Sequence, residues 1–418
     1  MKSKFLRFLL LPVFAIAAQA CGGNDTESNG NEPYIESLTT DYDGKAVVGM
    51  PVTINGSNFS PVASENKVLY GLGLSAVALI VKESSEEHLT FIAPNLLVSQ
   101  VKIRVSVKGK ESNSVIMEYT ELSAPPEDSW SDVPTLDFAK LGGTTKKIVD
   151  GVEWTSFHGE WEGQIRNINI VRTTLNEHNH IGIYYNYTKT YPDGYTPELK
   201  SGEDPRDLDK KCIYMDAIAG TNGPMACCHF VRVNGEAFPA LGEMEQDPWI
   251  VNCAITIDDN NVVDIVKVDD NYGAEKLPNK NVGSAGPLLV WEGEEQNYPE
   301  WRTEAFIATT HPRTAIGISK DGKTIVQVAV DGRWTSTDTE IRAIGMPTPL
   351  LAKMMKGLGC YKALNFDGGG GTAMWVYGEG NARNIVNRVS ENVDKDGWNG
   401  TKLRPTGNAV YIKSDLKK

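Results

Sequence analysis

The chain has 418 residues, which is enough for two or three domains because a single hydrophobic core rarely serves so many. Hydrophobic residues make up 40% and charged residues 23% of the chain, which excludes a disordered or fibrous protein. The net charge of -13 disfavours non-specific binding to nucleic acid or to an anionic membrane surface, but leaves room for local basic pockets.

The N-terminus predicts an export signal. Basic residues (Lys2, Lys4 and Arg7) precede an apolar stretch that is too short to span a membrane. The segment Ala18-Gln19-Ala20-Cys21 resembles a bacterial lipobox, and a polar run follows it. We therefore expect a signal peptide (1–20) and a lipidated tether (21–32) with the lipid on Cys21. This predicts export and anchoring to the outer membrane of a Gram-negative bacterium, on its periplasmic or its outer face. The alternative is an ordinary signal peptide with an incidental cysteine.

Residues 33–120 predict a small β-sandwich. Apolar and polar residues alternate in short runs between turn residues, as half-buried strands require. The string Gly49–Phe59, the pair Ala93-Pro94 and the closing segment Ser112–Tyr119 resemble an IPT/TIG domain. The resemblance implies an all-β, immunoglobulin-like fold that serves as a spacer or an interaction unit.

A linker and a larger domain are expected next. Residues 121–132 contain Pro125-Pro126 among polar residues, which is typical of a semi-stiff connection. From residue 133 to residue 418 strand-like runs dominate and no further boundary is evident. We therefore expect one α+β domain, built on a mixed or antiparallel sheet.

Two local patterns predict particular elements of the larger domain. Asp258–Asn261, between two apolar runs, predicts a hairpin turn and not a calcium loop, because the EF-hand spacing is missing. A helix is expected with Thr348 as its cap, Pro349 at its first position and Gly359 at its end. Leucines and methionines give this helix one apolar face, which we assign to the core.

The candidate chemistry lies in two segments near the C-terminus. In each, an apolar strand ends in an aspartate followed by glycine: Asp331-Gly332 and Asp367 with four glycines. A carboxylate at a strand end is held rigidly and can face a cleft. The glycines let a ligand approach the backbone, and their N–H groups can hold an anion. Asp-Gly is also a common turn dipeptide, so Asp331-Gly332 alone could be a hairpin turn, whereas four glycines exceed what a turn needs.

These segments resemble the phosphodiester glycosidase family. The main motifs are Arg313–Gly317, Val330–Arg333 and Leu364–Gly370, and their order is more specific than any one of them. Supporting matches extend the resemblance over about residues 160–412: Asn234–Phe238, Gly286–Val290, Val386–Arg388 and Arg404–Ala409. Glu236, Thr372 and Val389 depart from the pattern, where the family usually has glycine, serine and proline.

The resemblance implies hydrolysis of a sugar-1-phosphate diester, such as an α-N-acetylglucosamine-1-phosphate diester, between the anomeric carbon and its oxygen. Glycosidases usually pair two carboxylates, so Asp331 and Asp367 are the expected catalytic residues, with nucleophile, base and acid left unassigned. Arginine binds phosphate well because its planar fork donates two hydrogen bonds. The expected substrate-binding residues are Arg313, Thr314, Arg333, Asn234, Asn365, Gly368, Gly369, Gly370, Thr372, Arg388 and Arg404.

Two other functions fit the same residues. One is a surface lipoprotein that binds a glycan without turnover, and the other is a metal-dependent phosphodiesterase that cuts the phosphorus–oxygen bond. No cofactor is certain, although a divalent cation could bridge phosphate and carboxylates. The presence of Asp331, Arg333 and Asp367 together favours an enzyme. The expected partners are a glycan phosphodiester and, through the lipid anchor, a membrane, but no nucleic acid.

Histidines and cysteines offer weaker signals. His229 and His311 lie beside the motifs and either could act as a general acid, although a structural role is the simpler interpretation. Besides Cys21 the chain has five cysteines, an odd number, so at least one thiol stays free. Their spacing does not match a metal motif, and we interpret them as buried small apolar residues. They are Cys212, Cys227, Cys228, Cys253 and Cys360.

Overall fold

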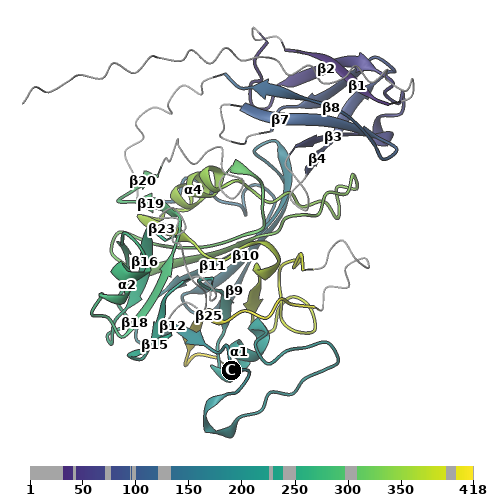
Figure 1. Ribbon diagram of the computed structural model, residues 1–418. Coiled ribbons are helices and arrows are strands. Elements are labelled where there is room, and N and C mark those ends of the chain that lie inside the picture. The colour runs from purple at the N-terminus through teal and green to yellow at the C-terminus, as the bar shows by residue number, and fades with distance from the viewer. Residues whose placement is uncertain are drawn as a thin grey trace, which may run out of the picture.

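The structure is a computed structural model, and it shows a small β-sandwich at one end of a larger domain (Figure 1). The expected signal peptide, the tether with Cys21, the linker 121–132 and the pair Cys227-Cys228 lie outside the described residues. The described ranges are 32–40, 44–70, 77–94, 96, 100–120, 133–225, 229–238, 251–296, 308–391 and 402–417.

Two four-stranded antiparallel sheets form the sandwich. Their strand orders are β1-β2-β6-β5 and β4-β3-β7-β8. Alternating residues such as Val52 and Ile54 point into the core between the sheets, where both are fully buried. This confirms the all-β immunoglobulin-like fold expected for this segment. The strands are β1 (Tyr34–Thr39), β2 (Pro51–Ser57), β3 (Asn66–Tyr70), β4 (Val77–Leu79), β5 (Val81–Ser84), β6 (His88–Ile92), β7 (Gln100–Val107) and β8 (Lys110–Glu118).

An eight-stranded sheet forms the centre of the larger domain. Its order is β20-β19-β23-β21-β22-β11-β10-β9, and neighbouring strands pair antiparallel. The strands are β9 (Thr144–Val149), β10 (Val152–Trp161), β11 (Gln164–Thr174), β19 (Leu288–Trp291), β20 (Glu294–Glu295), β21 (Arg313–Ile318), β22 (Thr324–Val330) and β23 (Lys362–Asn365).

Two smaller antiparallel sheets and short helices complete this domain. The sheets have the orders β12-β25-β13-β24 and β15-β14-β18-β16-β17, so the expected α+β architecture is confirmed, with antiparallel pairing between the described strands. The strands are β12 (Asn179–Tyr185), β13 (Ala219–Asn222), β14 (Val231–Val233), β15 (Glu236–Phe238), β16 (Cys253–Ile257), β17 (Val263–Lys267), β18 (Asn281–Ala285), β24 (Met374–Val376) and β25 (Asn408–Ser414). The α-helices are α1 (Leu208–Tyr214), α2 (Asn271–Glu275) and α4 (Thr348–Gly357).

The expected helix and hairpin both form, but the helix begins differently from the prediction. Pro347 stands at the N-cap of α4, and the Thr348 hydroxyl makes no capping bond within the described part of the chain. The predicted cap was therefore wrong by one residue, because the chain enters the helix along two prolines whose fixed φ suits its start. Gly359 follows the helix at φ 84°, as expected of a glycine there. Asp258–Asn261 links β16 to β17 as a turn, with Oδ1 of Asp258 accepting from two backbone N–H groups.

Candidate active site

The central sheet brings the two candidate aspartates to one edge. Strands β22 and β23 both pair antiparallel with β21, so they run parallel to each other and end at the same edge. Asp331 directly follows β22, and Asp367 follows β23 by two residues. Two strands separated by one other lie about 10 Å apart. The candidate site therefore lies at this edge of the sheet.

Asp331 is fully buried and its carboxylate is saturated with donors. Nδ2 of Asn387 donates to its Oδ1 at 3.0 Å, while the backbone N–H of Arg388 (2.8 Å) and Nδ2 of Asn167 donate to its Oδ2. Burial raises the pKa of Asp331 to about 6, and these donors limit the rise. Such a carboxylate is well placed to fix the Asn387-Arg388 segment.

Asp367 lies in a different environment. It is partly exposed, and a Cβ added at Gly371 would lie 3.0 Å from its Oδ2, so the glycine run borders the carboxylate. Loss of hydration raises its pKa to about 6, while the positive charge of Arg404 and the backbone N–H of Gly368 lower it. Asp367 thus has a partly exposed carboxyl group of raised pKa next to the glycine run.

The glycine run forms a tight 3₁₀ turn over Gly369–Gly371. Most of its N–H groups are used by the protein's own backbone: Gly369 donates to the carbonyl of Pro312, outside the turn, while Gly371 donates to that of Gly368 and Thr372 to that of Gly369. The predicted cradle of several N–H groups for an anion is therefore largely occupied by the protein itself. Because Gly369 and Gly370 have no side chains, the side chains of Arg333 and Arg404 can lie close to the turn.

Arg333 and Arg404 lie over the glycine run. A Cβ at Gly369 would come within 3.0 Å of Nη2 of Arg333, and one at Gly370 within 2.6 Å of Nη2 of Arg404. Arg333 has a φ of 68°, a left-handed conformation that is rare outside glycine and is often kept at functional sites. Arg404 is half-exposed and pairs with Glu391 through Nε and Nη2, both at 2.8 Å. These two guanidinium groups are the cations nearest to the glycine run that the geometry identifies.

The Arg388 side chain lies at the margin of this group. Its Nη2 donates to the Glu340 carbonyl at 2.9 Å, while its backbone N–H holds Asp331. Arg388 thereby links Asp331, at the start of the loop after β22, to Glu340 further along the same loop.

Four other predicted binding residues are buried in the framework below the site. Arg313 is 1% exposed, and its guanidinium donates to the carbonyls of Met346 and Thr309, with a pKa lowered by burial to about 9. Thr314 donates to Asn222, and Asn365 donates to the carbonyls of Gly286 and Phe366. Thr372 is buried too, and its carbonyl accepts from Asn387. The side chains of Arg313 and Thr314 therefore support the strand ends, whereas Oδ1 of Asn365 and the Thr372 hydroxyl have no hydrogen-bond partner in the described part of the chain and stay predicted binding groups.

Asn234 lies elsewhere, at an exposed hairpin turn between β14 and β15. Its φ of 51° and that of Gly235, 88°, are those of an Asn-Gly hairpin turn. The Asn-Gly pair beside Asp367 is instead Asn222-Gly223. Nδ2 of Asn222 donates to the Asp367 carbonyl at 2.7 Å, and its Oδ1 accepts from Ala373. The sequence interpretation missed Asn222, although the Asn-Gly pair at the end of an apolar run was a usable signal.

Lys211 is a second residue that the sequence interpretation missed. It is fully buried, and its Nζ donates to the carbonyls of Thr406 (2.6 Å) and Arg206. Burial lowers the pKa of this lysine to about 7. Lys211 thus ties helix α1 to the segment that carries Arg404. One of two adjacent lysines in a short helix carries no signal that would have identified it.

His229 and His311 contact nearby protein groups, and the described cysteines are buried. Nδ1 of His229 accepts from the backbone N–H of Met225 at 3.1 Å, and Nε2 of His311 lies 2.7 Å from Oγ1 of Thr309. Three cysteines are free and buried, as expected, and burial raises the pKa of each thiol: Cys212, Cys253 and Cys360. Among the described residues, no group of three or more His, Cys, Asp or Glu side chains could hold a metal ion.

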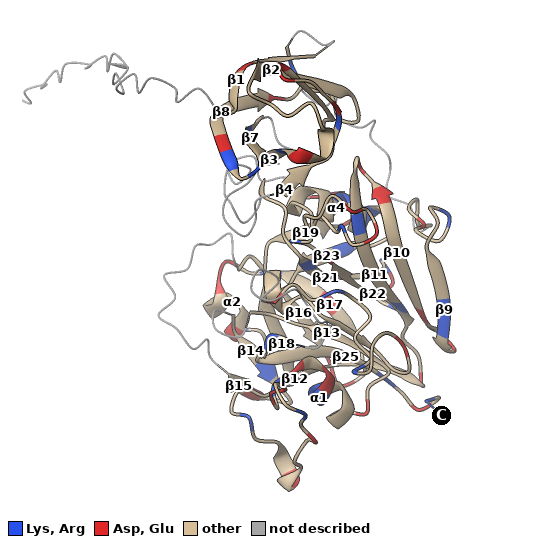
Figure 2. Cartoon of the chain, turned by 90° about the vertical axis from the view of Figure 1, so that its right-hand side faces the viewer, with Lys and Arg blue, Asp and Glu red and all other residues tan. Residues whose placement is uncertain are grey.

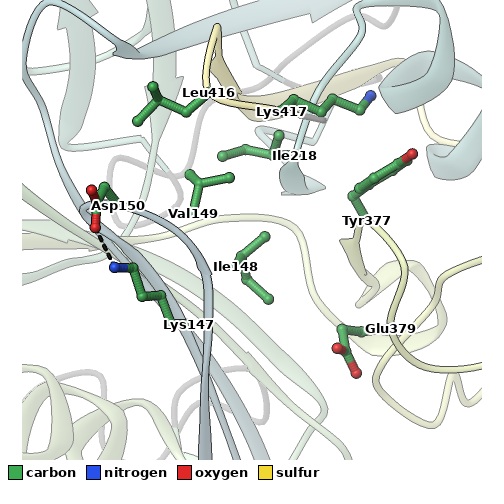
Figure 3. A pocket seen from close by; sticks show the side chains of 9 residues that line it. All are labelled: Lys147, Ile148, Val149, Asp150, Ile218, Tyr377, Glu379, Leu416 and Lys417. Atoms are coloured by element: carbon green, nitrogen blue, oxygen red, sulfur yellow. Dashed lines mark ion pairs between the residues drawn. The ribbon is translucent and has the colours of Figure 1, made fainter.

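A cavity of about 510 Å³ lies at the opposite edge of the central sheet (Figure 3). Its wall includes Lys147–Asp150. Strand pairing places this segment at the start of β22, because Val152 aligns with Thr173 and Thr173 aligns with Ile325. Asp331 follows the other end of β22. Lys147 pairs with Asp150, and Lys417 pairs with Asp216 at 2.6 Å. Because these charges are already neutralised by neighbours, the cavity is a weaker candidate than the edge with the aspartates.

Charged residues are spread over both domains and not gathered on one face (Figure 2). In the part of the chain that the structure describes, no helix is long and apolar enough to cross a membrane.

Two family models match parts of this chain. Residues 33–120 match the model of the IPT/TIG domain, and residues 216–413 match that of the phosphodiester glycosidases. The chain thus combines an IPT/TIG domain with a phosphodiester glycosidase domain, and both resemblances seen in the sequence are confirmed.

Solved structures resemble the chain only distantly. The catalytic domain of zebrafish N-acetylglucosamine-1-phosphodiester alpha-N-acetylglucosaminidase, auto-inhibited by its pro-peptide, is 14% identical over 65% of this chain and 88% of its own, with a TM-score of 0.45. A hypothetical protein from Synechocystis is 12% identical over 92% of this chain and 81% of its own, with a TM-score of 0.39. No curated protein matches the chain.

Proposed function

We propose that the protein hydrolyses a glycosyl phosphodiester, with a sugar-1-phosphate diester of a glycan as substrate. The observation that carries the proposal is that Asp331 and Asp367, two carboxyl groups of raised pKa, follow the same ends of two strands separated by β21, with Arg333 and Arg404 over the glycine run after Asp367. Paired carboxyl groups serve glycoside hydrolysis, and guanidinium groups serve the phosphate. The match of residues 216–413 to the phosphodiester glycosidases supports the same reaction.

The phosphate would bind over the glycine run. Arg333 and Arg404 approach it at Gly369 and Gly370, where an added Cβ would lie 3.0 and 2.6 Å from their Nη2 atoms. Arg404 is held by Glu391, whose carboxylate keeps the guanidinium over the run but would repel the phosphate. Binding of the diester therefore requires Arg404 to exchange part of its pairing with Glu391 for the phosphate oxygens.

Asp367 is the carboxyl group that would contact the reacting atoms. In the proposed step it accepts a proton from water as the water oxygen bonds to the anomeric carbon, and the bond from that carbon to the phosphate oxygen breaks. The phosphate monoester leaves with the bonding electron pair, and because it is a good leaving group it needs no strong acid. Asp331, whose oxygens are occupied, would position Arg388 and Asn387.

Hydrolysis of defined diesters tests the proposal. The chain without residues 1–31 would be incubated with UDP-N-acetylglucosamine and N-acetylglucosamine-α-1-phosphomethylmannose, alongside its Asp367→Asn variant. We expect free sugar from the parent and at least about 100-fold less from the variant, since a positioned acid–base group contributes that much. Binding that depends on Asp367 without release of sugar would instead identify a glycan-binding protein. Activity that chelators abolish, with the phosphorus–oxygen bond cut, would identify a metal-dependent phosphodiesterase.

We further propose that the protein is exported and held at the outer membrane by a lipid on Cys21. The support is the basic start of the chain, the short apolar stretch and the lipobox-like segment before Cys21, followed by a polar tether. A glycan phosphodiester outside the cytoplasm would be within reach of such an anchored enzyme.

A further inference from the structure

One residue of the larger domain belongs to the core of the sandwich. Ile344 is fully buried, and it packs in the same apolar cluster as Val68, Tyr70 and Leu79. These partners lie on β3 and β4, the strands on the side of the sandwich that faces the larger domain (Figure 1, Figure 2). The sandwich therefore completes its core with a side chain that lies more than 220 residues further along the chain.

Polar contacts accompany this apolar one. Arg342 is 1% exposed, and its Nη2 donates to the carbonyl of Ala78 in β4 while its Nη1 donates to the Ser336 carbonyl at 3.0 Å. Oγ1 of Thr310 donates to the hydroxyl of the buried Tyr70 at 3.4 Å. A buried guanidinium is stable only while its donors are used, so Arg342 depends on the carbonyl that the sandwich supplies.

Arg342 and Ile344 lie on the loop that begins at Asp331. The loop, residues 331–346, doubles back on itself, because Trp334 and Ala343 exchange two backbone hydrogen bonds of 3.2 and 3.0 Å. Its base is tight, since a Cβ at Gly332 would lie 3.0 Å from the Cα of Gly345. Its outgoing limb carries Asp331 and Arg333, and its returning limb is docked on the sandwich.

The larger domain holds the same returning limb from below. Ile344 donates its N–H to the Ile165 carbonyl at 2.9 Å, and the buried Arg166 donates to the carbonyls of Ile344 (3.1 Å) and Gly345. At the tip of the loop, the Glu340 carbonyl accepts from the Arg388 guanidinium. The Thr339 carbonyl lies 2.9 Å from Nε2 of His158. The returning limb of the loop is thus held between the two domains at Arg342 and Ile344, while residues 337–341 at its tip are exposed.

We propose that the IPT/TIG domain is a working part of the hydrolytic site, which positions Arg333 by clamping Ile344 and Arg342 of the loop 331–346. The inference rests on the proposed function, because it assigns a role in that reaction. Ile344 and Arg342 are positioning residues that touch no substrate. Displacement of a catalytic or binding group by about 1 Å can cost up to about 100-fold in rate, so a loosened loop should lower turnover.

The test compares two buried isoleucines of the same apolar cluster in the full chain. Ile344→Ala removes the clamp, whereas Ile54→Ala opens a comparable cavity in the sandwich at β2, away from the loop. For each we would measure kcat and KM on the diester that the parent hydrolyses best, and amide hydrogen exchange at Trp334, Ala343 and Ile344. Arg342→Lys, which keeps one donor for Ala78, and Arg342→Ala form a second pair.

We expect Ile344→Ala to lower kcat by about ten-fold and to speed exchange in the loop, while Ile54→Ala speeds exchange in the sandwich alone and keeps the parent's kcat. Arg342→Lys should recover part of the turnover that Arg342→Ala loses. Equal kcat and equal loop exchange for the two isoleucine variants would overturn the inference. If the parent hydrolyses no diester, the proposed function fails, and the exchange data alone then show whether the sandwich clamps the loop.

Discussion

At the scale of single residues, Asp331 and Asp367 have the same raised pKa of about 6 for different structural reasons. Asp331 is fully buried, and three hydrogen-bond donors to its carboxylate partly offset the lost hydration. Asp367 has the Gly368 N–H and the field of Arg404 to offset its lost hydration, and it stays partly exposed. A carboxyl group that must exchange protons with water needs the second environment.

The raised pKa of Asp367 predicts how activity depends on pH. A base must be unprotonated to accept a proton, so kcat/KM should rise with pH through about 6 and level off above it. The measurement is a pH–rate profile from about pH 4 to 8 with the best diester substrate. The exposed Asp269→Asn variant is the control and should keep the parent's profile. Activity that instead falls as pH rises through 6 would make Asp367 an acid and contradict the assigned role.

At the scale of elements, the site depends on two parallel strand ends and on the turn that follows one of them. Because β21 lies between β22 and β23, the strand ends before Asp331 and Asp367 are two strand separations apart. The glycine run packs on the carbonyl of Pro312, just before β21. The turn therefore lies beside the start of β21, with the side chains of Arg333 and Arg404 over it.

Gly370→Ala should test the arrangement of Arg404 with little loss of stability. The new Cβ would meet the ends of Arg404 and Glu391, which are flexible side chains and can move, and Gly370 has no left-handed φ to strain. We expect KM for the diester to rise by about ten-fold, the loss of one charge-assisted hydrogen bond, with the midpoint of urea unfolding nearly unchanged. Gly273→Ala in α2, where the nearest atom would lie at 3.3 Å, is the matched control. An unchanged KM would remove Arg404 from the phosphate site.

At the scale of the whole molecule, two domains with separate sheets share one docked loop. Ile344 joins the core of the sandwich, and Arg342 donates to the Ala78 carbonyl, so the sandwich contacts the loop 331–346 directly. The IPT/TIG domain that precedes the phosphodiester glycosidase domain is thus in direct contact with the loop that carries Asp331 and Arg333.

The anchoring of the whole molecule is tested at Cys21. Expressed with its own first residues in a Gram-negative host, the chain should fractionate with the outer membrane and incorporate labelled fatty acid. Cys21→Ser should abolish both, because serine lacks the thiol that carries the lipid, while Cys212→Ser changes a buried thiol and should abolish neither. A parent chain recovered wholly in the soluble periplasmic fraction would identify an ordinary signal peptide.

Much of the fold was predictable because its determinants are local. Alternation of apolar and polar residues along β2 or β7 decides which face is buried, and Asp258–Asn261 carries its own turn chemistry. The aspartates at the ends of β22 and β23 were identified in the same way. Their roles in catalysis stay predictions, but their location at one sheet edge follows from strand pairing.

The sequence alone determined the two domain families, the antiparallel strand-rich fold and the two aspartate–glycine segments, since each depends on residues that are neighbours in the chain. Only the tertiary structure decided that Asn222 lies beside Asp367 while Asn234 lies at a distant turn, that Arg313 is spent on buried carbonyls, and that Ile344 completes the sandwich. These depend on which surfaces pack together across long stretches of chain. Burial and hydrogen-bond saturation, which decide whether a polar side chain is free to bind a ligand, arise from that packing and leave no local pattern.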